Sequence, residues 1–208
     1  MSQTIIINQI NYTLPQLEKD CWHRLLNGAV KGRDPMHYIT LATQAAGNIG
    51  LRTVVLRKTV PATKTIIFHT DKRSPKCTEM ADSPLVSVLL YDHPAKIQLR
   101  LTARAIIQIT GAPVNEAWQQ TNLSSRRSYL TMLPPSSGQL EAASGLPPKV
   151  DGSELTMEES EAGRQNFAVV TLQVLSIDWL HLGAAGHRRA FFTYDSSGTL
   201  TGQQWLVP

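Results

Sequence analysis

Between Ile97 and Ala105 the chain alternates strictly between apolar and polar residues, a pattern typical of a β-strand with one buried face. The apolar residues, beginning with Ile97, would face a core, and the polar residues, beginning with Gln98 and Arg100, would face away from it. The whole β-rich run covers Lys96–Thr110, so a sheet must organise this part of the chain. The polar row is either plain solvent exposure or part of a binding surface, and the alternation leaves both interpretations open.

Further β-rich runs flank this one, and short turn signals containing Gly, Asn, Asp or Pro separate them. Many short strands at hairpin spacing, with few helices, favour a closed or nearly closed antiparallel barrel. The fold class expected is therefore mainly β with peripheral helices. Leu85–Tyr91 is apolar at nearly every position, which predicts a strand covered on both faces. The other predicted strands are Met36–Thr43, Leu51–Val60, Thr65–Thr70, Asn166–Leu182, Arg188–Asp195 and Gly202–Val207.

Helical spacing of apolar residues predicts a helix over Pro15–Gly28, before Asp34-Pro35 breaks the chain. We therefore divide the chain into an N-terminal helical extension, residues 1–35, and a barrel domain, residues 36–208. A second helical region, as one or two short helices, is expected over Gly111–Leu133. Residues 134–165 carry four Pro and four Gly and predict a long loop inserted in the barrel domain.

Charge is unevenly distributed: Gly50–Leu130 holds twelve Lys and Arg against five Asp and Glu, a local balance of +7. The insert holds six acidic and two basic residues. A cationic body suggests an anionic partner such as a nucleotide, although a solvated basic face would have the same composition. Two cysteines without CxxC spacing, no secretion signal and no apolar run long enough for a bilayer predict a cytoplasmic protein without a disulfide framework.

The segment after Thr70 carries a helix-start signal, with Ser74 at the N-cap and Pro75 at the first helical position. The helix should end near Asp82, because Ser83-Pro84 follows it. Its first turn would present free backbone N–H groups beside the ammonium of Lys76, and together these make an anion site. An ordinarily capped surface helix is the alternative.

Arg52 and Arg57 form a second cationic element on one predicted strand. Five residues apart on a regular strand, they fall on opposite faces and about 16 Å apart along it. They could serve one ligand only if that ligand is elongated and the strand is bulged or lies at a subunit boundary. A mononucleotide or dinucleotide cofactor has the required length. No phosphate loop, GxGxxG fingerprint or metal-ligand spacing of histidines is present, so no metal is expected.

These segments, in this order, resemble the pyridoxamine 5′-phosphate oxidase family of FMN-binding split barrels. The resemblance extends from about Met36 to Pro208. It rests on Met36–Thr43, Arg52–Arg57, Ile67–Thr70 followed by Ser74-Pro75-Lys76, Gln98-Leu99-Arg100, and the ending Trp205–Pro208.

The resemblance implies an antiparallel split barrel that forms a homodimer with FMN at the subunit interface. Arg52 and Lys76 would contact the phosphate, Thr70 and Ser74 would supply donors nearby, and Gln98 would hydrogen-bond the isoalloxazine. Pro75 replaces the Arg that usually precedes the phosphate-binding Lys. The cofactor residues implied are Arg52, Thr53, Val54, Val55, Leu56, Arg57, His69, Thr70, Ser74, Lys76, Gln98, Ser136 and Trp179.

The sequence departs from the family where the oxidase would hold its substrate phosphate. Where the family has a Lys, this sequence has Arg57, and where the family has a Tyr and an Arg, it has Trp118 and Asn122. The family's final basic signature is replaced by a segment that contains His187 and Arg189. These five residues are the candidate substrate contacts. Since several fixed donors are missing, FMN binding is better supported than vitamin B6 oxidation.

Three functions follow from these observations. The first is an FMN-dependent oxidoreductase, in which a small substrate transfers a hydride to N5 of FMN. The second is a flavin-binding protein without turnover, which the sequence does not separate from the first. The third, less favoured, is a basic barrel that binds nucleic acid through Arg100, Arg104 and the strand arginines. Only 6% of the chain is aromatic, and no aromatic residue interrupts the polar row to stack on bases.

Overall fold

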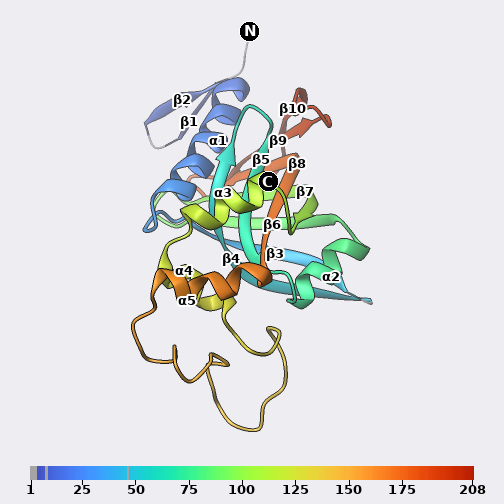
Figure 1. The fold of residues 1–208 in the computed structure, drawn as a ribbon. Helices are drawn as coiled ribbons and strands as arrows, with labels where there is room; N and C mark the ends of the chain where they lie inside the picture. The colour runs from blue at the N-terminus through green and yellow to red at the C-terminus, as the bar shows by residue number, and fades with distance from the viewer. Residues whose placement is uncertain (1–3, 8, 46) are drawn as a thin grey trace.

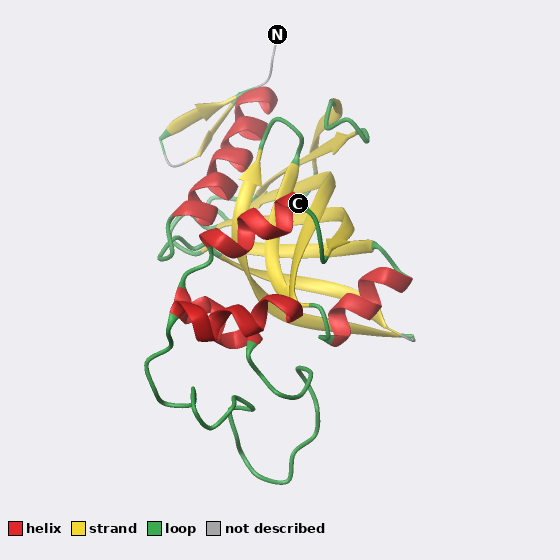
Figure 2. Ribbon diagram, in the orientation of Figure 1, coloured by secondary structure: helices red, strands yellow, loops and turns green. Residues whose placement is uncertain are grey.

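A computed structural model describes residues 4–7, 9–45 and 47–208 of the chain. Strands dominate it, and helices lie around their periphery (Figures 1 and 2). The strands are β1 Ile5–Ile7, β2 Ile10–Tyr12, β3 Tyr38–Ala45, β4 Asn48–Val60, β5 Thr65–Asp71, β6 Leu85–Asp92, β7 Ile97–Gln108, β8 Phe167–His181, β9 Arg188–Tyr194 and β10 Leu200–Leu206. The helices are α1 Leu14–Val30, α2 Pro75–Asp82, α3 Ala112–Gln120, α4 Leu123–Arg126 and α5 Met157–Ser160, with 3₁₀ turns η1 Arg127–Tyr129 and η2 Glu161–Asn166.

Six strands close into an antiparallel barrel in the order β8-β5-β4-β3-β6-β7, and β7 pairs with β8 again. Closure depends on β8, whose first half pairs with β5 and whose second half pairs with β9 on the same edge. The other edge of β8 pairs with β7 along nearly its whole length. β10 extends the sheet beyond β9. The prediction of a mainly β, antiparallel split barrel is confirmed.

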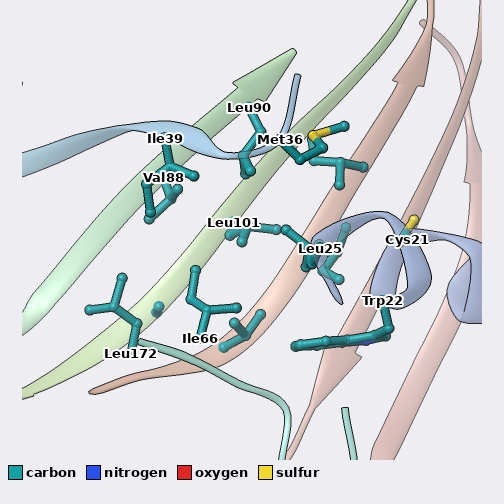
Figure 3. Packing of buried hydrophobic residues seen from close by; sticks show 14 of the residues in the cluster. Cys21, Trp22, Leu25, Met36, Ile39, Ile66, Val88, Leu90, Leu101 and Leu172 are labelled. Atoms are coloured by element: carbon teal, nitrogen blue, oxygen red, sulfur yellow. The ribbon is translucent and has the colours of Figure 1, made fainter. Parts of the chain in front are cut away.

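The strand alternation predicted for β7 determines which residues fill the barrel. Ile97, Leu99, Leu101 and Ala103 are at most 1% exposed, whereas Arg100 on the alternate face is exposed. Figure 3 shows how side chains from different strands meet inside the barrel, among them Ile39, Ile66 and Leu101. Side chains alternate between the two faces of each strand, and those that point inward therefore form one continuous core.

Helix α1 belongs to this same core and does not stand apart from the barrel. Cys21, Trp22 and Leu25 are buried on its inner face and approach the strand side chains (Figure 3). The indole Nε1 of Trp22 donates to the Tyr194 hydroxyl at 3.0 Å, and that hydroxyl donates to Glu18 at 2.9 Å.

Helix α1 matches the predicted helix Pro15–Gly28 and extends slightly beyond it at both ends. Residues 1–3 and 8 of the predicted N-terminal extension lie outside the described residues, and β1 and β2 form a hairpin that the prediction missed.

The second helical region and strand β6 differ from their predictions, whereas most of the insert agrees with its prediction. The second helical region is α3 followed by the single turns α4 and η1, since Thr121-Asn122 interrupts it. Residues 134–165 are irregular up to α5, as the Pro and Gly content predicts, and they extend away from the barrel (Figure 1). Strand β6 is covered on one face only: Leu85 and Leu89 are 53% and 41% exposed within the single chain. No helix among the described residues has the length and apolar character needed to cross a membrane.

Truncation of Leu25 tests whether α1 is part of the barrel core. Leu25→Ala should lower the free energy of unfolding by roughly 2–5 kcal/mol, because it opens a cavity at a fully buried position. The adjacent Leu26 is 40% exposed, so Leu26→Ala should cost less than about 1 kcal/mol. Urea unfolding of both variants measures the difference, and equal losses would contradict a shared core.

Candidate functional site

One pocket of about 440 Å³ gathers ten of the thirteen predicted cofactor residues. It lies between β4, the end of β5, the start of α2, η1 and the beginning of the insert. Its size is within the ordinary range for small-molecule sites. The charged side chains that line it, those of Arg52, Arg57 and Lys76, are all cationic. The predicted residues in its lining are Arg52, Thr53, Val54, Val55, Arg57, His69, Thr70, Ser74, Lys76 and Ser136.

Lys76 lies at the start of α2 with hydroxyl partners only. Its Nζ donates to Thr70 Oγ1 at 3.0 Å and to Ser74 Oγ at 2.5 Å. Within the described part of the chain, no carboxylate comes within ion-pair distance of this ammonium. Burial, together with the nearby charge of Arg52, lowers the pKa of Lys76 despite the opposing effect of the acidic groups around it. A half-buried cation without a counter-ion is a place where an anion would be stabilised.

The start of α2 adds to the positive character of this corner. Ser74 occupies the N-cap with extended backbone, Pro75 follows at the first helical position, and no acidic residue lies in the first turn. Ser74 Oγ does not cap the helix and accepts from Lys76 instead. The positive end of the helix dipole therefore lies beside Lys76 without a carboxylate in the first turn to offset it.

Arg52 lines the same pocket and is held by protein partners. Its Nη2 lies 2.7 Å from Glu79 Oε2, its Nη1 donates to Gly50 O at 3.0 Å, and it also donates to Thr43 Oγ1. Burial alone would raise the pKa of Glu79, but hydrogen bonds from Thr43 and Arg52 and the nearby cations lower it. The guanidinium is thus positioned at the pocket, with part of its charge balanced by Glu79.

Arg57 reaches the pocket from the far end of the same segment of β4. The β4–β5 pairing shifts register between Leu56 and Lys58, so the strand is irregular at Arg57. This is the bulge that the sequence required if both arginines were to serve one ligand. The Arg57 side chain is exposed, and its Nη2 lies 3.4 Å from Ser125 Oγ. Arg52 and Arg57 therefore border one pocket within a single chain.

His69 and Tyr129 form the more buried side of the pocket. Burial, reinforced by Arg57, lowers the pKa of His69 to about 4, so its imidazole is neutral at pH 7. Burial also raises the pKa of Tyr129 to about 12, although Arg57 opposes the shift, so the phenol stays protonated. His69 packs edge-on against Phe167 with ring centroids 4.8 Å apart. Both groups are therefore uncharged donors or acceptors beside the cations.

Three predicted cofactor residues lie outside this pocket. Leu56 is fully buried in the barrel core. Gln98 lies on the outer face of β7, opposite Tyr91 and Leu180 in the strand pairing. Trp179 is fully buried on the inner face of β8 and packs in the barrel core. The alternation of β8 turns Trp179 inward and its neighbour Leu180 outward, so Trp179 does not line this pocket, and its contact with flavin stays a prediction.

The five candidate substrate residues do not converge. Only Arg57 lines the pocket. Trp118 lies on the buried side of α3 and donates to Glu161 at 3.0 Å, and Asn122 caps α4 by accepting from Ser125 N at 2.8 Å. His187 is exposed in the β8–β9 loop, and Arg189 pairs with Asp178 at 2.7 Å on the outer face of the barrel. Within the single chain these four residues therefore lie apart from the pocket, and their contact with a substrate stays a prediction.

Sequence reasoning missed four residues that shape the site. Glu79 holds Arg52, Tyr129 and Ser128 line the pocket from η1, and Pro135 lines it from the insert. The i, i+3 spacing of Lys76 and Glu79 on one helix was a usable signal for an acidic group near the cations. Nothing in the sequence around Tyr129 indicates that η1 lines the same pocket as β4.

The comparisons with known proteins can now be set beside this geometry. Residues 19–108 match the family model described as "Pyridoxamine 5'-phosphate oxidase, FMN-binding domain". The resemblance to this family is confirmed. The match runs from α1 to the end of β7 and includes every predicted cofactor residue except Ser136 and Trp179. No curated protein sequence matches the chain.

Two solved structures share the fold over nearly the whole chain. One is a pyridoxamine 5′-phosphate oxidase-related, FMN-binding protein from Nostoc punctiforme, 19% identical, with a TM-score of 0.69 and coverage of 91% of this chain and 97% of that one. The other is PhzG from Burkholderia lata in complex with tetrahydrophenazine-1-carboxylic acid, 18% identical, with a TM-score of 0.63 and coverage of 91% and 92%. At these identities the likeness establishes the split-barrel fold.

The neutral His69 predicts a pH dependence of stability. The unfolded chain takes up a proton near the ordinary His pKa of 6.5, while the folded chain does so only near pH 4. Stability is therefore complete above about pH 6.5 and falls as the pH drops towards 4, by at most roughly 3 kcal/mol. Urea unfolding between pH 7 and pH 4 should show a flatter profile for His69→Gln. His23→Gln, at an exposed position, should keep the wild-type slope.

Proposed function

We propose that this chain binds FMN in the pocket along β4, with the phosphate at Lys76 and the start of α2. The observation that carries the proposal is the half-buried Lys76 ammonium, which has two hydroxyl partners and no carboxylate partner among the described residues. The family model supports FMN as the anion, because the matched domain is FMN-binding by description. The pocket between Lys76 and Arg57 suits a mononucleotide better than a small ion.

The residues present fit such a cofactor. Lys76, Thr70 and Ser74 would hold the phosphate, and Arg52 would add charge from the side of Glu79. Pro75 supplies no cation where the family usually has Arg, so this phosphate site relies on fewer charges. Val54, Val55 and the neutral His69 would border the ring system without adding charge.

We further propose an oxidoreductase function. Bound FMN supplies a two-electron acceptor, taking a hydride from a small substrate at N5 and passing the electrons to an acceptor such as dioxygen. The chain's own part is to bind, to orient and to present protonated donors, since no strong general base lines the pocket. A flavin-binding protein without turnover remains the alternative. Assays with B6 vitamers and reduced nicotinamides, following flavin reduction or peroxide, distinguish the two functions.

We also propose that two copies pair through the outer face of the barrel. Register brings Leu51, Leu89 and Tyr91 to this face from β4 and β6, and all three are at least 40% exposed in the single chain. An exposed apolar sheet face of this kind is typical of an interface. The continuously apolar β6 sequence is explained if a second copy covers it. Gln98 lies on the same face, where it could contribute to the cofactor pocket of a partner.

Loss of the Lys76 charge tests the cofactor site. Lys76→Ala should weaken FMN binding by roughly 1–3 kcal/mol, or about five- to a hundredfold, because a charge-assisted contact to the phosphate is lost. Riboflavin, which has no phosphate, should bind both proteins alike. Quenching of flavin fluorescence on titration gives both dissociation constants.

Lys72→Ala is the matched control, since Lys72 lies four residues earlier, is exposed and does not line the pocket. It should leave the FMN dissociation constant within about twofold of wild type. An unchanged FMN affinity in Lys76→Ala, or a wild-type protein that does not retain FMN, would refute the proposed site.

A charge on the outer face tests the proposed pairing. Leu89→Glu should shift the protein from dimer to monomer in sedimentation velocity, because the carboxylate would be desolvated in the interface. Ile6→Glu, at a position that is 70% exposed on β1, should leave the dimer intact. A monomeric wild-type protein would contradict the pairing while leaving the phosphate site to its own test.

A further inference from the structure

The insert forms a second pocket that continues from the proposed cofactor pocket. This second pocket, of about 480 Å³, lies between η1 and residues 131–145. Ser128, Pro135 and Ser136 line both pockets, so the two share a wall. A molecule in the second pocket would therefore lie next to whatever occupies the first.

The segment that encloses the second pocket is a closed loop with anchored ends. Met132 N donates to Gly145 O at 2.8 Å, and this bond brings together two limbs of the loop that are thirteen residues apart in the sequence. Arg73 Nη2 donates to both the carbonyl and the hydroxyl oxygen of Thr131 at 3.0 Å, and Arg73 is itself paired with Asp71 at 2.7 Å. Compact surface loops with adjoining ends, Ω-loops, are frequently functional.

The remainder of the insert is fixed to η1 as well. Arg127 donates to Ser153 O at 2.6 Å and to Val150 O. Leu130, Val150 and Leu155 form a small apolar cluster of their own. These contacts fix η1, and Ser128 of η1 lines the second pocket together with the residues of the loop.

The two pockets differ sharply in charge. Arg52, Arg57 and Lys76 line the first, whereas Glu141 is the one charged side chain among the described residues that line the second. Leu133, Pro134 and Ala142 supply apolar surface, and Thr131, Ser137 and Gln139 supply neutral polar groups. The lining presents a carboxylate to an anionic molecule, and Arg73, which contacts Thr131 of the lining, is already paired with Asp71. Electrostatic complementarity therefore disfavours an anion here.

We propose that this second pocket is the substrate pocket and that it takes a small organic molecule without an anionic group. The proposal rests on the FMN site proposed above, and it names the substrate class for that site. It agrees with the dispersal of the residues expected to clamp a substrate phosphate: Trp118 and Asn122 have structural partners, and Arg189 is paired with Asp178.

Three probes of similar shape and different charge test the proposal: quinoline, 1-methylquinolinium and quinoline-2-carboxylate. Each is titrated into the full chain, with and without FMN, and binding is followed by ligand-observed NMR. The neutral and cationic probes should bind, and the carboxylate should bind at least about tenfold more weakly. Glu141→Gln should remove any advantage of the cation over the neutral probe.

Two tryptophan variants locate the binding. Ala142→Trp fills the second pocket and should weaken quinoline binding by about tenfold or more while leaving FMN affinity within about twofold. Leu140→Trp is the matched control, because Leu140 is fully exposed in the same loop and does not line the pocket. Equal quinoline binding by Ala142→Trp and wild type, or carboxylate binding as tight as quinoline binding, would overturn the proposal.

The separate FMN titration keeps the two proposals apart. Suppose that FMN fails to bind but Ala142→Trp still loses quinoline binding. The cofactor proposal then fails, and the second pocket binds small molecules without being the substrate pocket of a flavin site, which overturns the proposal made here. If FMN binds and none of the three probes does, the substrate class proposed here is wrong and the cofactor proposal stands.

Discussion

Closure of the barrel by β8 is the constraint on which the rest of the structure depends. A strand has two edges, and β8 uses one for β7 and divides the other between β5 and β9. The long pairing with β7 converts an open sheet into a barrel with one interior. That interior is filled by alternate residues of every strand and by the apolar face of α1.

The same closure places the cationic corner. Asp71 ends β5 opposite Phe167 of β8, and α2 begins four residues later, so Lys76 leaves the barrel at a fixed position. Because Thr70 is part of β5, its hydroxyl is held in position to accept a hydrogen bond from the ammonium of Lys76. Preorganised donors of this kind bind an anion at a lower entropic cost than flexible surface lysines do.

Two further surfaces surround this corner, and they differ in chemistry. The outer barrel face is apolar around Leu51 and Leu89, with the Arg100–Asp178–Arg189 ion pairs beside them. The insert contributes neutral polar and apolar groups and one carboxylate. In the functions proposed above, these surfaces would have three tasks: the cations would hold a phosphate, the sheet face would meet a second copy, and the insert would select a substrate.

Local pattern in the sequence was sufficient for the strands, for α1 and for the N-terminus of α2, because alternation, helical spacing and Ser-Pro capping act within a few residues. It was also sufficient to predict an anion site at Lys76 and the start of α2, whereas Thr70 and Ser74 were implied as donors by the family resemblance. Only the tertiary structure decided that Trp179 faces the core, that Arg52 is shared with Glu79 and that η1 and the insert complete the pocket. These depend on strand register and on contacts between distant segments, and a single sequence carries no local record of either.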